Sequence, residues 1–129
     1  MIRTTALALA AFLAACPAFA TGEIYCEAPD NSEAAFGYGF GSVPGLAIIS
    51  ATIHADGKHW SMVEVDGAVP IVVAQGAHDN ARTLIDFTDP EFNTILASVR
   101  LMSAVEGDDY VTVGTLQIPG VGVFPLVCE

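Results

Sequence analysis

Short runs of β-forming residues recur along residues 21–129, and turn residues separate them. This part of the chain holds 13 Val, 8 Ile and 7 Thr but only 6 Leu and 1 Lys, which favours strands over helices. The runs span residues 23–27, 35–40, 46–54, 59–65, 70–75, 82–88, 94–103, 110–118 and 121–128. Asp-Gly, Asp-Asn and Pro-Gly pairs punctuate them. We therefore predict an all-β fold, a small antiparallel barrel or sandwich of about eight strands.

The first twenty residues have a different character and predict export. A cationic start that ends at Arg3 precedes an apolar run over residues 6–16, and Ala18-Phe19-Ala20 matches the small-x-small site of a signal peptidase. The run is shorter than the roughly 20 apolar residues that span a bilayer. We predict a signal peptide over residues 1–20, a single β-domain over residues 21–129, and a periplasmic or secreted location.

A second processing site overlaps the first. Leu13-Ala14-Ala15-Cys16 resembles the lipobox of bacterial lipoproteins, in which the cysteine is acylated. Pro17 suits a lipobox poorly, and the few residues between Cys16 and Cys26 leave little tether. Cleavage after Ala20 is favoured, with a lipoprotein anchored through Cys16 as the alternative.

Two cysteines remain in the mature chain, near its two ends. In an oxidising compartment Cys26 and Cys128 are expected to form a disulfide, and no Cys-x-x-Cys spacing suggests redox chemistry. Bridged cysteines have Cα atoms within roughly 7 Å, so the first and last strands should be neighbours. This favours a closed barrel over an open sandwich.

The dipeptide Asp56-Gly57 predicts a hairpin with a two-residue type I′ turn. Its register places His54 opposite His59, close enough for two imidazoles to share a metal ion. His78 or Asp79 could provide a third ligand, although two solvated histidines are the simpler interpretation. Alternation assigns one face of the hairpin to the core, namely Ile49, Ala51, Ile53, Trp60 and Met62, and the other to solvent, namely Ser50, Thr52, His54, His59 and Ser61.

Residues 90–104 admit two interpretations. Asp89-Pro90 resembles a helix start, and Phe92, Ile95 and Val99 recur at helical spacing. Alternation of Ile95, Ala97, Val99 and Leu101 fits a strand equally well, and the segment contains weak helix formers. We predict a strand.

Residues 36–41 read Phe-Gly-Tyr-Gly-Phe-Gly, which lacks the lysine and following helix of a phosphate-binding loop. An inward aromatic face on a bent strand is the favoured interpretation, and an aromatic wall of a ligand pocket is the alternative.

Acidic residues gather near Asp86, Asp89 and Glu91 and at Asp108-Asp109, but no spacing matches a calcium loop, so solvated turn acids are expected. No catalytic motif is present, and we predict neither enzymatic activity nor a cofactor.

Charge is the feature most open to a functional interpretation. The mature chain carries 3 Lys+Arg against 15 Asp+Glu, since Arg3 leaves with the signal peptide. Such a field disfavours nucleic acid and attracts a basic protein. In size and architecture the chain is similar to the bacterial inhibitors of host lysozyme. We predict an interaction domain for a basic protein, with a small-ligand carrier of barrel form as the alternative; the sequence does not determine the oligomeric state.

Overall fold

The computed structural model describes residues 21–43 and 45–129, which form ten strands and, within those ranges, no helix. The predicted signal peptide and Cys16 lie outside the described residues. None of the described residues belongs to a helix long and apolar enough to cross a membrane. The strands are β1 (Gly22–Glu27), β2 (Ala35–Phe40), β3 (Ile48–Ala55), β4 (Lys58–Ser61), β5 (Val69–Pro70), β6 (Val72–His78), β7 (Arg82–Thr88), β8 (Ile95–Glu106), β9 (Asp109–Ile118) and β10 (Gly122–Cys128). The fold is all-β, as predicted, with ten strands rather than about eight.

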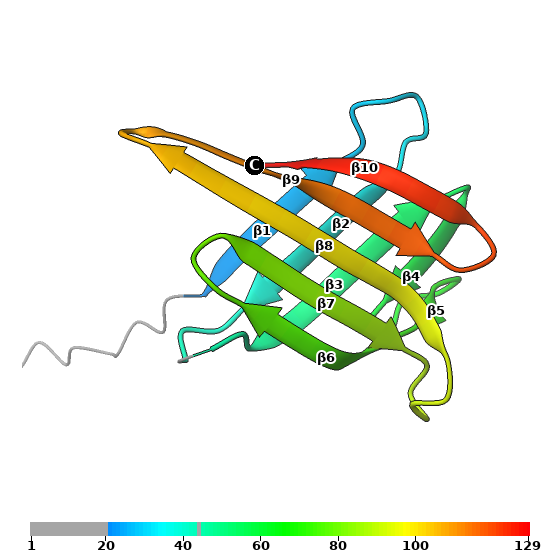
Figure 1. The fold of residues 1–129 in the computed structure, drawn as a ribbon. Helices are drawn as coiled ribbons and strands as arrows, with labels where there is room; N and C mark the ends of the chain where they lie inside the picture. The colour runs from blue at the N-terminus through cyan, green and yellow to red at the C-terminus, as the bar shows by residue number, and fades with distance from the viewer. Residues whose placement is uncertain (1–20, 44) are drawn as a thin grey trace, which may run out of the picture.

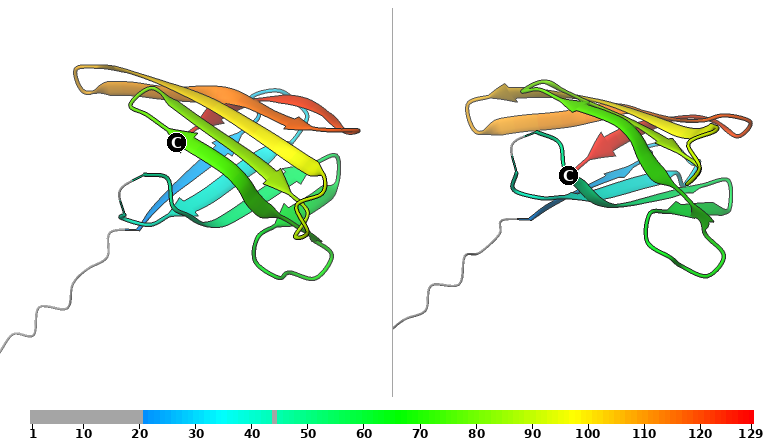
Figure 2. Two further views of the ribbon diagram at one scale, coloured as in Figure 1. Left: turned by 60° about the horizontal axis from the view of Figure 1, so that its bottom comes forward. Right: turned by 90° about the horizontal axis from the view of Figure 1, so that it is seen from below.

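All ten strands belong to one sheet, in the order β5-β4-β3-β2-β1-β10-β9-β8-β7-β6. Neighbours from β1 to β4 and from β6 to β10 pair antiparallel, because short connections join them. The edge strands β5 and β6 are consecutive in the chain and are separated only by Ile71. The sheet therefore curls into a nearly closed barrel with its seam in the middle of the sequence (Figure 1, Figure 2).

A disulfide joins the first and last strands, as predicted. Cys26 and Cys128 are direct cross-strand partners, with Cα atoms 3.9 Å apart. The β1–β10 ladder holds only one further pair, Glu27 with Val127, and the N–H of Glu129 donates to the carbonyl of Tyr25. The covalent bond therefore reinforces the shortest antiparallel junction in the sheet.

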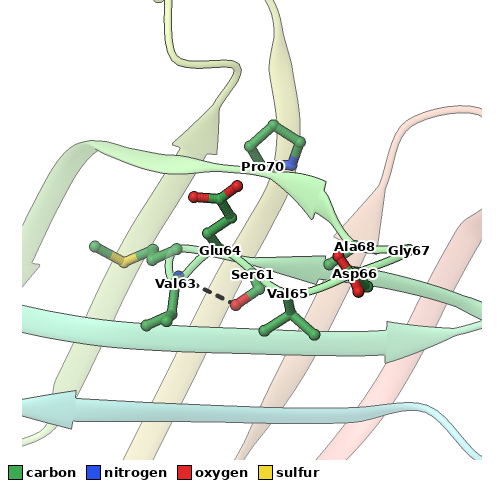
Figure 3. Close-up of a pocket in the computed structure, with 9 residues that line it drawn as sticks. Ser61, Val63, Glu64, Val65, Asp66, Gly67, Ala68 and Pro70 are labelled. Atoms are coloured by element: carbon green, nitrogen blue, oxygen red, sulfur yellow. Dashed lines mark hydrogen bonds between the residues drawn. The ribbon is translucent and has the colours of Figure 1, made fainter.

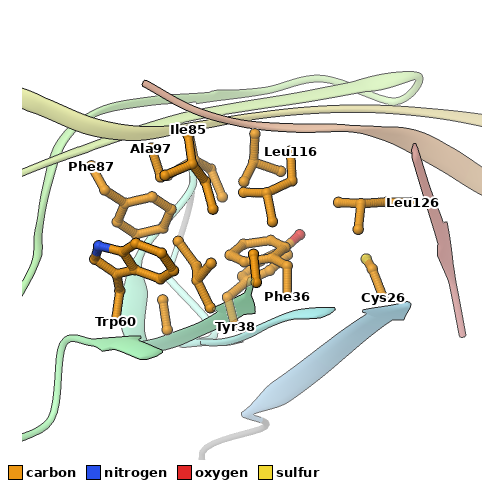
Figure 4. Packing of buried hydrophobic residues seen from close by; sticks show 14 of the residues in the cluster. Cys26, Phe36, Tyr38, Trp60, Ile85, Phe87, Ala97, Leu116 and Leu126 are labelled. Carbon is orange, nitrogen blue, oxygen red and sulfur yellow. The ribbon is translucent and has the colours of Figure 1, made fainter. Parts of the chain in front are cut away.

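The barrel is flattened into two layers whose strands cross, with β1 to β5 in one layer and β6 to β10 in the other (Figure 1). Side chains from both layers meet between them and fill the interior (Figure 4). Phe36 stacks on Tyr38 at 5.4 Å between ring centroids and meets Phe87 edge-on at 6.0 Å. Trp60 is buried, as its place in the hairpin pattern predicted.

Residues 95–106 form strand β8, which confirms the strand interpretation. Asp89 ends the preceding strand pairing by closing a turn: its carboxylate accepts hydrogen bonds from the N–H groups of Asn93 and Thr94. Ala97, Val99 and Leu101 face the core. The apparent helix-start signal is therefore an acid-capped turn.

The hairpin prediction holds at its turn and fails at two positions. Asp56 and Gly57 both have positive φ, as a type I′ turn requires, and His54 pairs with His59. Ile49 is 58% exposed rather than in the core, because the register shifts at Gly39/Phe40 and pairs Phe40 with Ile48. Ser61 is buried rather than solvated, and β4 ends there instead of continuing to Val65.

Candidate functional site

Strand β1 directs acidic and aromatic side chains away from the barrel. Ile24 and Cys26 pack against the core, while Glu23, Tyr25 and Glu27 alternate with them on the outer face. This alternation is the ordinary consequence of the strand pleat. The outer face of β1 is therefore an exposed tyrosine between two carboxylates.

The ring of Tyr25 lies over a glycine of the neighbouring strand. Tyr25 pairs with Gly37, and a Cβ added there would lie 3.3 Å from Cδ2 of the tyrosine ring. The aromatic residues of β2 point inward, with Phe36 and Tyr38 buried, which confirms the packing interpretation of residues 36–41. Glycine on the outer face gives the Tyr25 ring a flat surface, and its side chain stays 46% exposed.

Two adjoining hollows surround this tyrosine and are lined by carboxylates. One, of about 300 Å³, is lined by Tyr25, Glu27, Asp30 and Glu33 together with nearby alanines. The other, of about 230 Å³, adds Glu129 and shares Tyr25 and Glu27. We call Tyr25, Glu27, Asp30, Glu33 and Glu129 the Tyr25 groove.

No cation neutralises this groove among the described residues. The ion pairs in residues 21–43 and 45–129 are Arg82–Asp79 at 3.2 Å and Arg100–Asp86 at 2.9 Å, both in the other layer. Desolvation raises the pKa of Tyr25, and the charge of Glu27 and a hydrogen bond to it add to the effect. Hydrogen bonds from Ser32 lower the pKa of Asp30. The groove therefore favours the ionised form of Asp30 and the neutral form of the Tyr25 phenol.

This arrangement suits the side chain of a lysine or an arginine. A cation is attracted to the face of an aromatic ring and to carboxylates around it. Sequence reasoning identified the overall acidity but did not single out these residues. The available signal was the Glu-x-Tyr-x-Glu alternation at positions 23 to 27, which predicts one outward face.

The predicted histidine pair is present as a stacked pair of rings. The centroids of His54 and His59 lie 4.1 Å apart with 18° between the planes. Desolvation, followed by the charge of His59, lowers the pKa of His54. Nε2 of His59 is buried, and no group among the described residues forms a hydrogen bond with it.

Metal binding at His54 and His59 stays a prediction. Nitrogen lone pairs lie in the ring plane, so face-to-face imidazoles must rotate before both can coordinate one ion. His78, a suggested third ligand, contacts Thr83 at 2.8 Å on β6 and β7. Across residues 21–43 and 45–129, no three His, Cys, Asp or Glu side chains gather in a way that could hold a metal ion.

Asp86 differs from the solvated acid that was expected. It is buried and accepts a hydrogen bond from Gln75, with Arg100 2.9 Å away. Burial acts to raise its pKa, but hydrogen bonds from Gln75, Ser98 and Arg100 and the Arg100 charge outweigh it, so the pKa is lowered. Asp89 is a turn cap, and the N–H of Thr94 is the main cause of its lowered pKa.

The connection from β4 to β5 encloses a surface hollow of about 450 Å³ (Figure 3). Oγ of Ser61 accepts a hydrogen bond from the N–H of Val63, which turns the chain away from β4. Glu64 and Asp66 follow in the same connection, whose valines Val63 and Val65 are exposed. Residues 62–68 of this one connection thus supply most of the lining of the hollow.

Comparison with known proteins identifies no relative: no family model, no curated protein and no solved structure matches this chain.

Proposed function

We propose that the mature chain is an exported, non-enzymatic interaction domain that binds a basic protein, with the Tyr25 groove as its contact surface. The observation that carries the proposal is the exposed tyrosine flanked by carboxylates that no cation neutralises among the described residues. An exposed aromatic side chain provides contact area, and the surrounding charge speeds association with a cationic partner.

The packed interior favours this proposal over the carrier. The aromatic side chains that could have lined a lumen, Phe36, Tyr38 and Phe87, contact one another in the core instead. A ligand in the lumen would have to displace them, which large, well-packed side chains resist.

The location is proposed with the function. A disulfide between the chain ends is typical of proteins in oxidising compartments. We propose cleavage after Ala20 and release into the periplasm or the medium. Intact-mass analysis of the protein exported by a bacterial host should give a chain that begins at Thr21, whereas a diacylglycerol adduct on Cys16 would require an anchored lipoprotein instead.

Binding to a basic protein tests the proposed surface. The probe is a strongly basic lysozyme, titrated calorimetrically into the oxidised mature chain at about 50 mM and about 300 mM salt, which changes electrostatic screening. We expect binding that weakens with salt. The double variant Glu27→Gln and Glu33→Gln should weaken lysozyme binding at least about tenfold, and Tyr25→Ala should weaken it by a similar factor.

The matched control removes the same charge elsewhere. Glu64→Gln with Asp66→Asn neutralises two exposed acids in the connection between β4 and β5, in the same layer of the barrel. This variant should lose only about twofold to threefold of the affinity, through the overall field. Equal losses in both double variants would mean that net charge, rather than the Tyr25 groove, determines binding. No binding at low salt would exclude lysozyme as a partner.

A further inference from the structure

The outer face of strands β7 to β10 exposes large apolar side chains. Met102 is 60% exposed, and the pairing register places it beside Val113, which is itself beside Val127. Leu84 on β7 and Val111 on β9 lie on the same face, on opposite sides of this row, and are 38% and 56% exposed. We call Leu84, Met102, Val111, Val113 and Val127 the apolar face.

A shallow hollow of about 400 Å³ lies in this face. Leu84, Met102 and Val113 line it, and the arginines Arg82 and Arg100 lie on the same outer surface. Mature-chain cations are scarce, and these are two of the three. Two of the three cations of the mature chain and these apolar side chains therefore lie on the same side of the barrel.

Beyond the hollow, β8 and β9 continue as a projecting arm, residues 103–111. Strand β7 ends its pairing with β8 at Met102, and β10 ends its pairing with β9 at Thr112. Beyond these points the β8–β9 hairpin extends past its neighbours (Figure 1). Ala104 and Val111, which pair with each other, carry the outer face onto this arm. Val105 and Tyr110, 68% and 63% exposed, lie on the opposite face of the arm because side chains alternate along a strand.

Charge decides what can cover this surface. Arg82 is paired with Asp79 and Arg100 with Asp86, so the surface around the hollow is close to neutral. Two copies of a mature chain with 3 Lys+Arg against 15 Asp+Glu, a formal charge of −12, repel each other over most approaches. A face with balanced charges is where a second copy meets the least repulsion.

The register also makes the face complementary to itself. Arg100 lies three residues before Ser103 on β8, and Glu106 lies three residues after it, paired with Asp109. A two-fold axis across the strands at Ser103 would place each of these charges about 10 Å from the axis. Arg100 of each copy would then approach Glu106 and Asp109 of the other, with Met102 facing Ala104 near the centre.

We propose that the apolar face and the outer side of the arm, with Ala104, Glu106, Asp109 and Val111, form the interface of a homodimer with this two-fold arrangement. Two or three strands about 30 Å long provide several hundred Å² per copy, which is small for a dimer interface. The dimer should therefore dissociate on dilution. The Tyr25 groove adjoins the edge of this interface, where Val127 pairs with Glu27 and lines the hollow that contains Glu129, but the residues of the groove are not part of the interface.

Sedimentation velocity on the oxidised mature chain tests the dimer, between about 1 µM and about 500 µM because a small interface implies weak association. We expect the sedimentation coefficient to rise from the monomer to the dimer value over this range. Met102→Glu should keep the protein monomeric throughout. The matched control is Ile49→Glu, at a side chain 58% exposed in the other layer, which should leave the transition unchanged.

A second variant tests the charge contact. Glu106→Arg with Asp109→Arg makes the protein less acidic, which by itself would favour association. The proposed arrangement predicts weaker association, by at least about tenfold, because the new arginines meet Arg100 of the other copy. Glu64→Arg with Asp66→Arg makes the same charge change elsewhere and should strengthen association.

Three results would overturn the dimer: a monomer at every concentration, a dimer that survives Met102→Glu, or loss of association in Ile49→Glu as large as in Met102→Glu. Stronger association of the double variant Glu106→Arg and Asp109→Arg would overturn the two-fold arrangement. Lysozyme binding is measured at about 1 µM, where the chain is monomeric, so the outcomes of the two proposals are independent.

Discussion

The two layers of the barrel have outer surfaces of opposite character. The β1–β5 layer carries all of the Tyr25 groove except Glu129, and the carboxylates of the groove lack cationic partners among the described residues. The β6–β10 layer carries the apolar face, where Arg82 and Arg100 are both paired to acids. Both layers bury the same kind of core. The comparison shows that the inward-facing side chains of the strands determine the fold, whereas the outward-facing side chains determine what each surface can bind.

The largest effect is expected where the two layers are joined. Replacing both Cys26 and Cys128 with serine removes a cross-link between residues 102 apart, which the chain-entropy model values at about 4 to 5 kcal/mol. We expect urea denaturation to show a loss of that order. Hydrogen exchange should accelerate first in β1 and β10, because only two residue pairs join them. An unchanged free energy of unfolding would mean that strand pairing alone holds the junction.

The glycines of the two layers should respond differently to alanine. A Cβ at Gly114, on β9, would lie 1.9 Å from the carbonyl oxygen of Arg100, which is backbone that cannot yield without displacing β8. Gly114→Ala should destabilise the protein by about 3 kcal/mol. Urea denaturation measures it.

Gly37→Ala is the matched change in the other layer. Its Cβ would meet the side chains of Tyr25 at 3.3 Å and Thr52 at 3.6 Å, and both can shift. Its free energy of unfolding should change by less than about 1 kcal/mol, while displacement of the Tyr25 ring should weaken lysozyme binding. A loss as large as that of Gly114→Ala would contradict this difference between the layers.

Arg100 should matter more to stability than Arg82. Arg100→Met leaves Asp86 buried without its ionic partner and should cost about 2 kcal/mol, whereas the exposed Arg82–Asp79 pair should contribute little to stability. Thermal and urea unfolding of both methionine variants measures this difference. Equal losses of stability in the two variants would mean that the Arg100–Asp86 pair contributes no more than the exposed Arg82–Asp79 pair.

The Arg100 variant also has a pH signature. The folded-state pKa of Asp86 is lowered, so its ionisation stabilises the fold above the unfolded-state pKa, near 4. That contribution is lost as pH falls through the folded-state pKa. Below that range the free energies of unfolding of Arg100→Met and of the unsubstituted protein should converge. A difference in free energy that stays constant down to the lowest pH would contradict this role of Asp86.

The smallest effect is expected at the histidine pair. The pKa of His54 in the folded chain is lowered, so the unfolded chain takes up the proton first as pH falls below about 6.5. Stability should therefore decrease slightly on acidification through this range. NMR titration should give His54 a pKa below its ordinary value, and His59→Ala should move it back toward that value.

Zinc binding distinguishes a metal site from a stacked pair. If His54 and His59 coordinate Zn²⁺, calorimetry at neutral pH should show weak binding that fades as the imidazoles protonate and is absent in His54→Ala. Identical heats for His54→Ala and the unsubstituted protein would mean that the pair holds no metal.

The sequence alone determined the local and covalent features of this protein. Strand-forming runs, the Asp56-Gly57 turn and the Cys26–Cys128 bond each depend on residue type and spacing, which short-range sterics and chain geometry fix. The opposition of His54 and His59 followed from the turn length for the same reason.

Only the tertiary structure decided which side chains share a surface. The exposure of Ile49 follows from a register shift between β2 and β3, and the burial of Asp86 depends on Gln75 and Arg100 from the strands on either side. The Tyr25 groove unites Glu27 with Glu129, from opposite ends of the mature chain, because β1 pairs with β10. Such contacts depend on cross-strand register, and register is set by packing across the whole barrel rather than by any one strand.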